Sequence, residues 1–289
     1  MNIGIDGSRI STNEMTGVDG YTFNLVKAIS SVDKVNKYII YFSKVPKYFE
    51  IGHKNVSTRV IPLTRFWTQI RLALECLIRP PDILFVPAHT MPVIRRPNLK
   101  TIVTIHDLGA EFLAEYHQFP QKYYLNWATE YVALHASHII AVSESTKKDL
   151  VKQFKVDPKR ITVVYEAVDT NKFSPRGTKE IEQTKKELGI TKKYLLFVGT
   201  IQPRKNLLRL IEAFSKLENK SLELVLAGKP GWLFEEIYEA PKKFKVEGRV
   251  KFVGYVKDDQ LPALYSGAEM FVFPSLYEGF GLPILEAMA

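Results

Sequence analysis

Residues 269–289 read EMFVFPSLYEGFGLPILEAMA, and this stretch combines the patterns of a strand, a turn and a helix, which recur in this order along the chain. The apolar run EMFVFP is typical of a short buried strand. A glycine-containing turn, EGFG, follows it, and LPILEAMA has the apolar spacing of a helix. The first backbone N–H groups of a helix lack partners inside the helix, and together with the helix dipole they attract anions. The order of strand, turn and helix therefore predicts an anion-binding turn in an α/β fold.

Strand and helix patterns alternate in the same way from residue 2 onward, which predicts two doubly wound α/β domains with parallel sheets that face a cleft. Several strand runs are continuous in Val, Ile and Leu, as in strands covered on both faces. The predicted strands are 2–7, 37–42, 57–63, 82–87, 99–107, 137–143, 160–166, 194–200, 222–228, 249–256 and 269–274. The predicted helices are 20–31, 65–78, 120–136, 143–154, 206–217, 232–244, 258–268 and 281–289, with Ser143 as an N-cap.

A polar segment without sustained apolar runs divides the chain into an N-terminal domain, 1–168, and a C-terminal domain, 169–289. Residues 169–193 are predicted to be a linker with a short helix. The sequence stops at Ala289 inside an apolar helical run that has no glycine, asparagine or basic stop signal. We therefore expect the second domain to be incomplete at its C-terminus.

The composition, 46% apolar and 25% charged, is that of a globular protein, and no apolar run reaches the roughly 18 residues that span a bilayer. The N-terminus lacks a signal peptide, and Cys76 is the only cysteine, so a cytoplasmic location is expected. The net charge is +9, and residues up to Val168 hold 21 Lys+Arg against 15 Asp+Glu. No nucleic-acid-binding motif is present. The basic excess fits a solvated surface and a membrane-facing patch equally well, so peripheral contact with the inner face of the cell membrane stays open.

Two basic residues, Arg204 and Lys205, follow the predicted strand 194–200 and precede a helix. A guanidinium binds two phosphate oxygens at once and an ammonium adds a mobile charge, so the pair suits a diphosphate. Cations at a helix N-terminus oppose its dipole, which disfavours a purely structural role. His106 ends the strand 99–107, where ligands bind in parallel sheets. We expect it to hydrogen-bond a sugar hydroxyl, the alternative being a structural histidine that caps the loop.

Two glutamates lie in the C-terminal stretch, Glu278 in the EGFG turn and Glu286 on the following helix. Paired carboxylates can act as general acid and base, but nothing here sets the separation that glycoside hydrolysis needs. Accepting two ribose hydroxyls is the simpler role for Glu286, although single glutamates are usually surface residues. The loop after the first strand carries Gly7, Gly17 and Gly20, which permit close backbone approach to a ligand. It lacks the GxGxxG fingerprint of dinucleotide binding.

The chain resembles glycosyltransferase family 4, the glycosyl transferases group 1, in FVGTIQPRKNLLRLIEAF, LVLAGKPGW, VTIHDL, IIAVSESTKKDL and the terminal Glu-x7-Glu pattern around EGFGLP. The resemblance covers nearly the whole chain in order, and it is most similar to mannosyltransferases of surface-polysaccharide assembly. It implies the GT-B fold, with an acceptor-binding first domain and a second domain that binds a nucleotide sugar. It also implies a retaining hexosyltransferase acting on a glycan or lipid-linked glycan, with no cofactor, no bound metal and no enzymatic nucleophile.

The resemblance assigns roles residue by residue. Arg204 and Lys205 match the basic pair on the donor diphosphate. Glu286 matches the glutamate that binds the ribose, and Glu278 matches the glutamate beside the transferred sugar. The turn whose backbone amides face the sugar and phosphate is matched by Phe280, Gly281 and Leu282. His106 matches the histidine near the donor sugar, and Gly17 matches the first-loop glycine near the diphosphate. The expected catalytic residues are His106, Arg204, Lys205 and Glu278.

Two positions depart from the family pattern. Asp19 stands where the family often has a second glycine, so its side chain must point away from a diphosphate or serve the acceptor. Glu166-Ala167 replaces a common Asn-Gly, and we expect this change to affect nothing catalytic. Two other functions compete with the transferase: a non-catalytic nucleotide-sugar- or glycan-binding subunit, including an inactive truncated paralogue, and a Rossmann-type oxidoreductase. The absence of GxGxxG followed by a ribose-binding acid disfavours the oxidoreductase.

Overall fold

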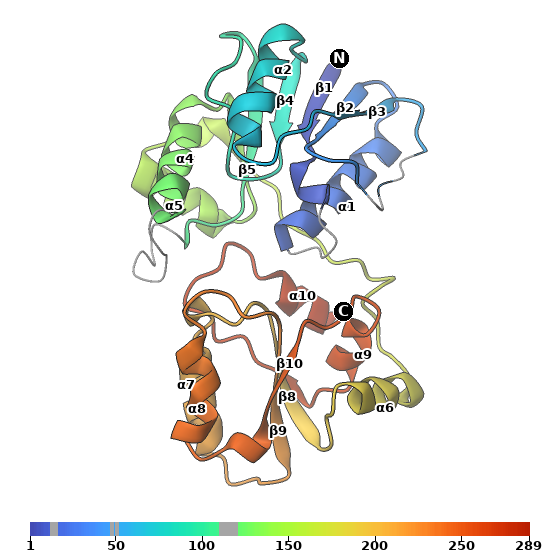
Figure 1. The fold of residues 1–289 in the computed structure, drawn as a ribbon, viewed down its shortest axis with the longest axis vertical. Coiled ribbons are helices and arrows are strands. Elements are labelled where there is room, and N and C mark those ends of the chain that lie inside the picture. Colours follow the sequence, from blue (N-terminus) through green and yellow to red (C-terminus); the bar gives the residue numbers. More distant parts are fainter. Residues whose placement is uncertain (12–16, 47–48, 50–51, 110–120) are drawn as a thin grey trace. The chain divides into compact units, whose positions relative to one another are not determined.

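The computed structural model describes residues 1–11, 17–46, 49, 52–109 and 121–289. The chain forms two compact units, one of residues 1–108 and 121–166 and the other of residues 167–289 (Figure 1). Each unit is built on its own parallel sheet and is described by itself. The α/β class predicted from the alternating strand and helix patterns is confirmed.

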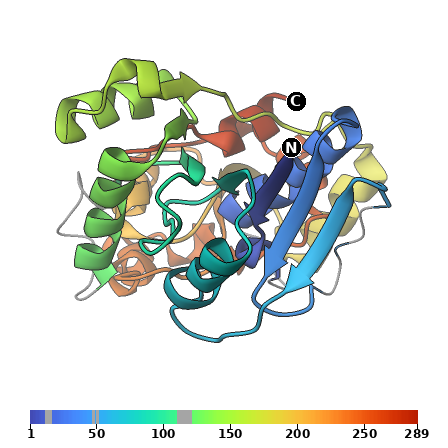
Figure 2. The same ribbon diagram turned by 90° about the horizontal axis from the view of Figure 1, so that it is seen from above.

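The sheet of the first unit has seven strands in the order β3-β2-β1-β4-β5-β6-β7, and all neighbours are parallel. The strands are β1 (Asn2–Asp6), β2 (Lys37–Phe42), β3 (Val56–Val60), β4 (Ile83–Val86), β5 (Lys100–Ile105), β6 (His138–Ala141) and β7 (Ile161–Val163). Figure 2 shows β1, β2 and β3, in shades of blue, lying side by side. β1 pairs with both β2 and β4, so the strand order reverses there, and ligands of such sheets bind outside the carboxyl ends of the strands.

The helices of the first unit are η1 (Ser8–Ser11), α1 (Gly17–Val32), η2 (Thr68–Leu72), α2 (Ala73–Ile78), α4 (Gln121–His135), α5 (Glu144–Phe154) and η4 (Pro158–Arg160). α1 covers one face of the sheet, where its Val26 belongs to a core with Ile40 and Phe42. The predicted N-cap of α5 is confirmed, because the Ser143 hydroxyl accepts a hydrogen bond from the Thr146 backbone N–H at 3.0 Å.

The helix predicted at 65–78 is present as two pieces, the π-helical η2 followed directly by α2. Trp67, Leu72 and Cys76 of this segment are buried, so the free thiol of Cys76 lies in the core. Among the residues that the structure describes, no helix is long and apolar enough to cross a membrane.

The sheet of the second unit has four parallel strands in the order β10-β9-β8-β11. The strands are β8 (Lys193–Val198), β9 (Leu222–Ala227), β10 (Val250–Gly254) and β11 (Met270–Phe271). The helices are α6 (Thr178–Glu187), η5 (Pro203–Lys205), α7 (Leu207–Ser215), α8 (Glu235–Lys243), η6 (Glu247–Arg249), α9 (Leu261–Ser266) and α10 (Leu282–Met288). The predicted linker segment 169–193 thus contains α6, which packs against α9.

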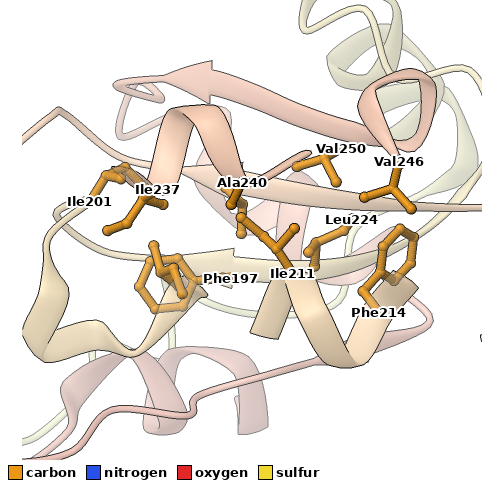
Figure 3. Packing of buried hydrophobic residues seen from close by; sticks show 11 residues of the cluster. Phe197, Ile201, Ile211, Phe214, Leu224, Ile237, Ala240, Val246 and Val250 are labelled. Carbon is orange, nitrogen blue, oxygen red and sulfur yellow. The ribbon is translucent and has the colours of Figure 1, made fainter. Parts of the chain in front are cut away.

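The side chains of this sheet alternate between two hydrophobic cores because successive residues of a strand point to opposite faces. Phe197 and Leu224 pack with Ile211 of α7 and Ile237 of α8 on one face (Figure 3). Leu196 belongs to the core on the opposite face. Helices therefore cover both faces of the sheet. Polar residues can be placed at the carboxyl ends of β8 and β11, which the helices do not cover.

Candidate donor-binding site

Two glycines bring the loops after β8 and β9 into backbone contact. Gly199 and Gly228 have φ angles of +150° and +152°, which side-chain-bearing residues rarely adopt. A Cβ atom at Gly228 would lie 1.9 Å from the Gly199 carbonyl oxygen, so any side chain there would displace the loop. This contact fixes the chain where it leaves β8 and enters η5, the short helix that carries Arg204 and Lys205.

Hydrogen bonds attach η5 to the segment that follows β11. The Leu276 backbone N–H donates to the Arg204 carbonyl oxygen at 2.9 Å, and the Asn206 side-chain amide donates to the Pro274 carbonyl oxygen at 3.1 Å. Asn206 has a φ of 59°, a left-handed conformation that asparagine tolerates better than most residues. Since β11 pairs with β8, the two segments leave the same edge of the sheet. The fold thereby places the EGFG turn beside the two basic residues.

The three predicted residues Arg204, Lys205 and Glu278 form one cluster. The Arg204 Nη1 donates to Glu278 Oε2 at 2.9 Å and to the Tyr277 carbonyl oxygen at 2.8 Å. The Lys205 Nζ donates to Glu278 Oε1 and lies 5.5 Å from the centroid of the Phe273 ring. The side chains of Arg204, Lys205 and Glu278 are only 15%, 10% and 19% exposed. Two cations share one carboxylate in a poorly solvated place, so the cluster keeps a net positive charge that favours a further anion.

Glu286 lies in a separate group with Tyr265 of α9. The Tyr265 hydroxyl donates to Glu286 Oε2 at 2.8 Å, and the Tyr265 ring packs edge-on against Phe271, with 5.4 Å between ring centroids. Burial raises the pKa of the Glu286 carboxyl above its usual value, although the Tyr265 hydrogen bond acts in the opposite direction. One Glu286 carboxylate oxygen thus accepts a hydrogen bond from Tyr265. That this carboxylate also binds a ribose stays a prediction.

The predicted turn residues lie between Glu278 and Glu286 in the sequence. Gly281 has a φ of +99° and directly precedes Leu282, the first residue of α10. Phe280 is partly buried. The left-handed conformation at Gly281 explains the glycine in the EGFG turn. That the backbone amides of this turn face a sugar and a phosphate is a prediction.

In the first unit, His106 follows β5 and is 8% exposed. Its Nε2 lies 2.9 Å from the Pro87 carbonyl oxygen, and its Nδ1 lies 3.0 Å from Glu166 Oε1. The Tyr21 ring meets the imidazole edge-on, with 4.6 Å between ring centroids. Both ring nitrogens of His106 therefore have protein partners, as in the structural alternative, and a hydrogen bond from His106 to a sugar hydroxyl stays a prediction.

The expected first-loop residues lie at the start of α1, while residues 12–16 of that loop are outside the described part of the chain. Gly17 is the first residue of α1 and is exposed, whereas Asp19 is buried in the first turn. Gly7 is required by packing, since a Cβ atom there would lie 2.6 Å from the Ile40 side chain. The role of Gly17 near a diphosphate stays a prediction.

The sequence interpretation missed Glu166 and Tyr265. Glu166 was assigned no catalytic consequence, yet it contacts the predicted histidine. It lies three residues after the end of β7, and the rule that carboxyl ends of parallel strands share one edge could have identified it. Tyr265 lies among apolar residues of α9, and no pattern in the sequence marks it as a partner of Glu286.

Two family models match this chain. Glycosyltransferase Family 4 matches residues 20–172, and Glycosyl transferases group 1 matches residues 179–289. The first match covers more than half of the chain, so the chain belongs to glycosyltransferase family 4.

The curated relatives include mannosyltransferases. O-antigen chain mannosyltransferase B of Escherichia coli is 31% identical over 194 residues, which is 66% of this chain and 51% of that relative. O-antigen chain mannosyltransferase RfbU of Salmonella typhimurium is 26% identical over 289 residues, covering 95% of this chain and 76% of that relative. The chain thus spans about half the length of the first of these relatives.

Solved structures confirm the GT-B fold. Sucrose-phosphate synthase from Thermosynechococcus elongatus has a TM-score of 0.75 at 18% identity, covering 100% of this chain and 79% of that chain. Anabaena HepE in complex with UDP-glucose has a TM-score of 0.72 at 17% identity, covering 99% of this chain and 77% of that chain. At these identities the likeness establishes the fold alone.

Proposed function

We propose that the chain is a retaining hexosyltransferase that moves mannose from a nucleoside-diphosphate sugar to a glycan or lipid-linked glycan during surface-polysaccharide synthesis. The observation that carries this proposal is the cluster of Arg204, Lys205 and Glu278 at the carboxyl edge of the second sheet. The mannosyltransferase relatives favour mannose, and the neighbour in complex with UDP-glucose favours a nucleotide-sugar donor. Residues 169–289 would bind the donor and residues 1–168 the acceptor.

The proposed reaction needs stabilisation of a leaving diphosphate. The bond between the anomeric carbon and the diphosphate oxygen breaks, and negative charge develops on that oxygen. Arg204 and Lys205 would stabilise this charge through preorganised hydrogen bonds, usually a large contribution to catalysis. The acceptor oxygen forms its bond on the same face of the sugar, and its proton passes to the departing phosphate. No cofactor is proposed, and a metal ion is not required because the two cations supply the positive charge.

A product assay tests the proposal. The protein is incubated with mannose and glucose donors carrying guanine or uracil bases, together with a lipid-linked glycan acceptor. Release of nucleoside diphosphate that depends on the acceptor, with a product of the same anomeric configuration as the donor by NMR, is expected. Activity that persists in EDTA is also expected. Tight donor binding without any product would favour the non-catalytic binding subunit instead.

An exposed apolar stripe on the first unit supports peripheral contact with a membrane. Phe66 precedes η2, and Ile70, Leu74 and Ile78 follow it at intervals of four residues along η2 and α2; the four residues are 70%, 53%, 42% and 62% exposed, in that order. Basic residues flank or interrupt this stripe at Arg65, Arg71 and Arg79. Apolar side chains beside arginines match the acyl chains and headgroups of an anionic bilayer surface. We therefore propose that this stripe docks the protein on the cytoplasmic leaflet, near a lipid-linked acceptor.

A further inference from the structure

One side of α4 in the first unit carries four ring-bearing residues in a row. Tyr124, Trp127, Tyr131 and His135 are spaced three, four and four positions apart, so they follow one another along the helix. The ring centroids lie 6.1 Å apart from Tyr124 to Trp127, 5.7 Å from Trp127 to Tyr131 and 4.5 Å from Tyr131 to His135. The Trp127 and Tyr131 rings are stacked, with 24° between their planes. We call these four residues the ring ladder.

Much of the ring ladder is open to solvent. Tyr124 and Trp127 are 41% and 46% exposed, and His135 is exposed as well. A different side of α4 packs into the core of the unit, where Ala128 and Val132 are buried. The ladder is therefore not needed to fill that core. A contiguous row of exposed aromatic side chains is typical of a surface that binds a ligand.

Arg95 holds the middle of the ring ladder in place. Its Nη1 donates to the Tyr131 hydroxyl at 2.9 Å and to the Pro92 carbonyl oxygen at 2.9 Å, and its Nη2 donates to the His135 carbonyl oxygen at 3.2 Å. The Tyr131 hydroxyl in turn donates to the Val93 carbonyl oxygen at 3.2 Å. The Tyr131 ring is thus fixed before a ligand arrives. It loses little freedom when a ligand packs on it, which lowers the cost of binding.

The direction of α4 places one end of the ring ladder toward the carboxyl edge of the first sheet. The chain leaves β5 at Ile105 and enters the neighbouring parallel strand β6 at His138, so the helix between them runs antiparallel to both strands. Tyr124 therefore lies toward the edge where ligands of such sheets bind, and His135 lies toward the opposite edge. The helix rises roughly 16 Å between these two residues, at about 1.5 Å per residue. An elongated ligand at the carboxyl edge can follow this row.

The charge of α4 indicates which class of ligand suits the ring ladder. From Tyr124 to His135 the helix has one carboxylate, Glu130, and no lysine or arginine. An anionic bilayer surface attracts basic residues, which flank the apolar stripe of η2 and α2 but are missing from this helix segment. A neutral glycan has C–H faces that pack on the negative faces of aromatic rings, and hydroxyls that bind to phenol and indole groups. The ring ladder thus matches a glycan better than a bilayer.

We infer that the ring ladder binds the sugar chain of the acceptor, with successive sugar rings packed on Tyr124, Trp127 and Tyr131. This inference rests on the proposed function, in which the first unit binds the acceptor. The end of the glycan that receives the next sugar would lie at the carboxyl edge of the sheet, and the older part of the chain would extend along α4. The ring ladder would then favour acceptors that carry several sugars over those that carry one.

Titration of the protein with mannotetraose, followed by NMR and without any donor, tests the binding itself. The indole N–H signal of Trp127 should shift, whereas that of Trp67, which donates to the Ile61 carbonyl oxygen at 2.7 Å in the core, should not. Trp127→Ala should weaken the binding about fivefold or more, and Trp127→Phe, which keeps an aromatic ring, should retain most of it. No binding by wild type, or equal affinity in wild type and Trp127→Ala, overturns the inference.

Leu134→Ala is the matched control for these variants. Leu134 is 59% exposed on the same helix but has no ring, so its removal should leave mannotetraose binding unchanged. Equal losses in Leu134→Ala and Trp127→Ala would indicate a general apolar contact and overturn the inference. Loss of binding to anionic vesicles in Trp127→Ala, with mannotetraose binding unchanged, would show that the ring ladder contacts a bilayer, which also overturns it.

Acceptor length gives the second readout. In Trp127→Ala the KM of a lipid-linked tetrasaccharide should rise about fivefold or more relative to the KM of a lipid-linked monosaccharide, because only the longer acceptor reaches along the ring ladder. Leu134→Ala should leave this ratio as in wild type. An unchanged ratio in Trp127→Ala overturns the inference while the proposed function stands. Binding of mannotetraose at Trp127 without any sugar transfer by wild type would support the ring ladder and count against the proposed function alone.

Discussion

The Arg204 guanidinium and the Glu278 carboxylate are joined by a hydrogen bond of 2.9 Å, although 74 positions separate them in the sequence. The parallel pairing of β8 with β11 makes this contact, because both residues follow neighbouring strands at one edge of the sheet. The same carboxylate binds Lys205. A diphosphate at this place would have to share the two cations with Glu278, and this competition leads to the first prediction.

Glu278→Gln should separate nucleotide binding from sugar transfer. Removing the carboxylate charge raises the positive potential of Arg204 and Lys205, while glutamine can still accept a hydrogen bond. We expect the Kd of free nucleoside diphosphate to fall or stay constant, and kcat with the nucleotide sugar to fall at least about tenfold, the effect of one charged hydrogen bond. Calorimetry and a turnover assay measure the two effects. A clear loss of nucleoside diphosphate affinity would show that Glu278 mainly positions the cations.

Glu286→Ala should weaken the binding of the nucleotide part of the donor. If the Glu286 carboxylate accepts ribose hydroxyls, its removal should raise the Kd of nucleotide sugar and free nucleoside diphosphate alike, by about ten- to a hundredfold for charged hydrogen bonds. Tyr265→Phe removes the hydroxyl that holds one carboxylate oxygen and should have a smaller effect. Equal nucleotide affinity in Glu286→Ala and wild type would contradict the binding of the ribose by Glu286.

Glu286 also predicts a pH dependence of nucleotide binding. Because burial raises the pKa of this carboxyl, it becomes protonated at a higher pH than an ordinary glutamate does. A protonated carboxyl accepts hydroxyl hydrogen bonds less well, so nucleotide affinity should fall as the pH falls through the raised pKa. Calorimetric titrations between pH 7.5 and 5 should show a steeper loss in wild type than in Glu286→Gln. Parallel profiles for the two proteins would contradict this account.

His89 predicts how stability depends on pH. Its pKa is lowered to about 4 in the folded state, whereas the ordinary value is 6.5, so the unfolded state binds more protons between these values. The contribution to stability is complete above pH 6.5 and is lost as the pH falls toward 4. Between pH 6.5 and 5 wild type should lose about 2 kcal/mol of unfolding free energy relative to His89→Gln. Urea denaturation at several pH values measures this difference, and identical slopes for both proteins would disprove the assignment.

The apolar stripe on η2 and α2 predicts binding to anionic vesicles. Replacing Ile70 and Leu74 by serine should weaken binding about tenfold or more, because each buried apolar side chain contributes roughly 1 kcal/mol or more. Leu217→Ser is the matched control, since Leu217 is 40% exposed on the second unit. Co-sedimentation with vesicles of phosphatidylglycerol and phosphatidylcholine measures this, and high salt should release the protein. Equal binding of all three proteins would exclude the stripe as the docking surface.

The fold was predictable because the strands are apolar runs at regular intervals. Continuous runs such as LLFV in β8 are buried on both faces, and each is followed by a polar or glycine-rich turn. The sequence also placed Arg204, Lys205 and His106 at strand ends. The contacts between these residues could not be predicted in the same way, because they depend on strand order. The Arg204–Glu278 pair requires β11 to lie beside β8 in the sheet, and no local sequence pattern indicates that strand order.

The partners of the His106 ring could not be predicted from the sequence for a related reason. A histidine at a strand end has two nitrogens, and their roles depend on which groups face them. Here a carbonyl from the β4 side and a carboxylate after β7 take both nitrogens. Glu166 follows a strand two positions away in the sheet, so only the assembled order β5-β6-β7 reveals the contact.

The most direct test of the central claim measures nucleoside diphosphate binding to wild type and to the double variant Arg204→Ala, Lys205→Ala by calorimetry. Lys216→Ala, which removes an exposed ion-paired lysine, is the control. If the two cations bind the diphosphate, the double variant should lose at least about a hundredfold in affinity, at 1.5–3 kcal/mol for each charged hydrogen bond, while the control binds like wild type. The same affinity in the double variant and wild type would contradict the account.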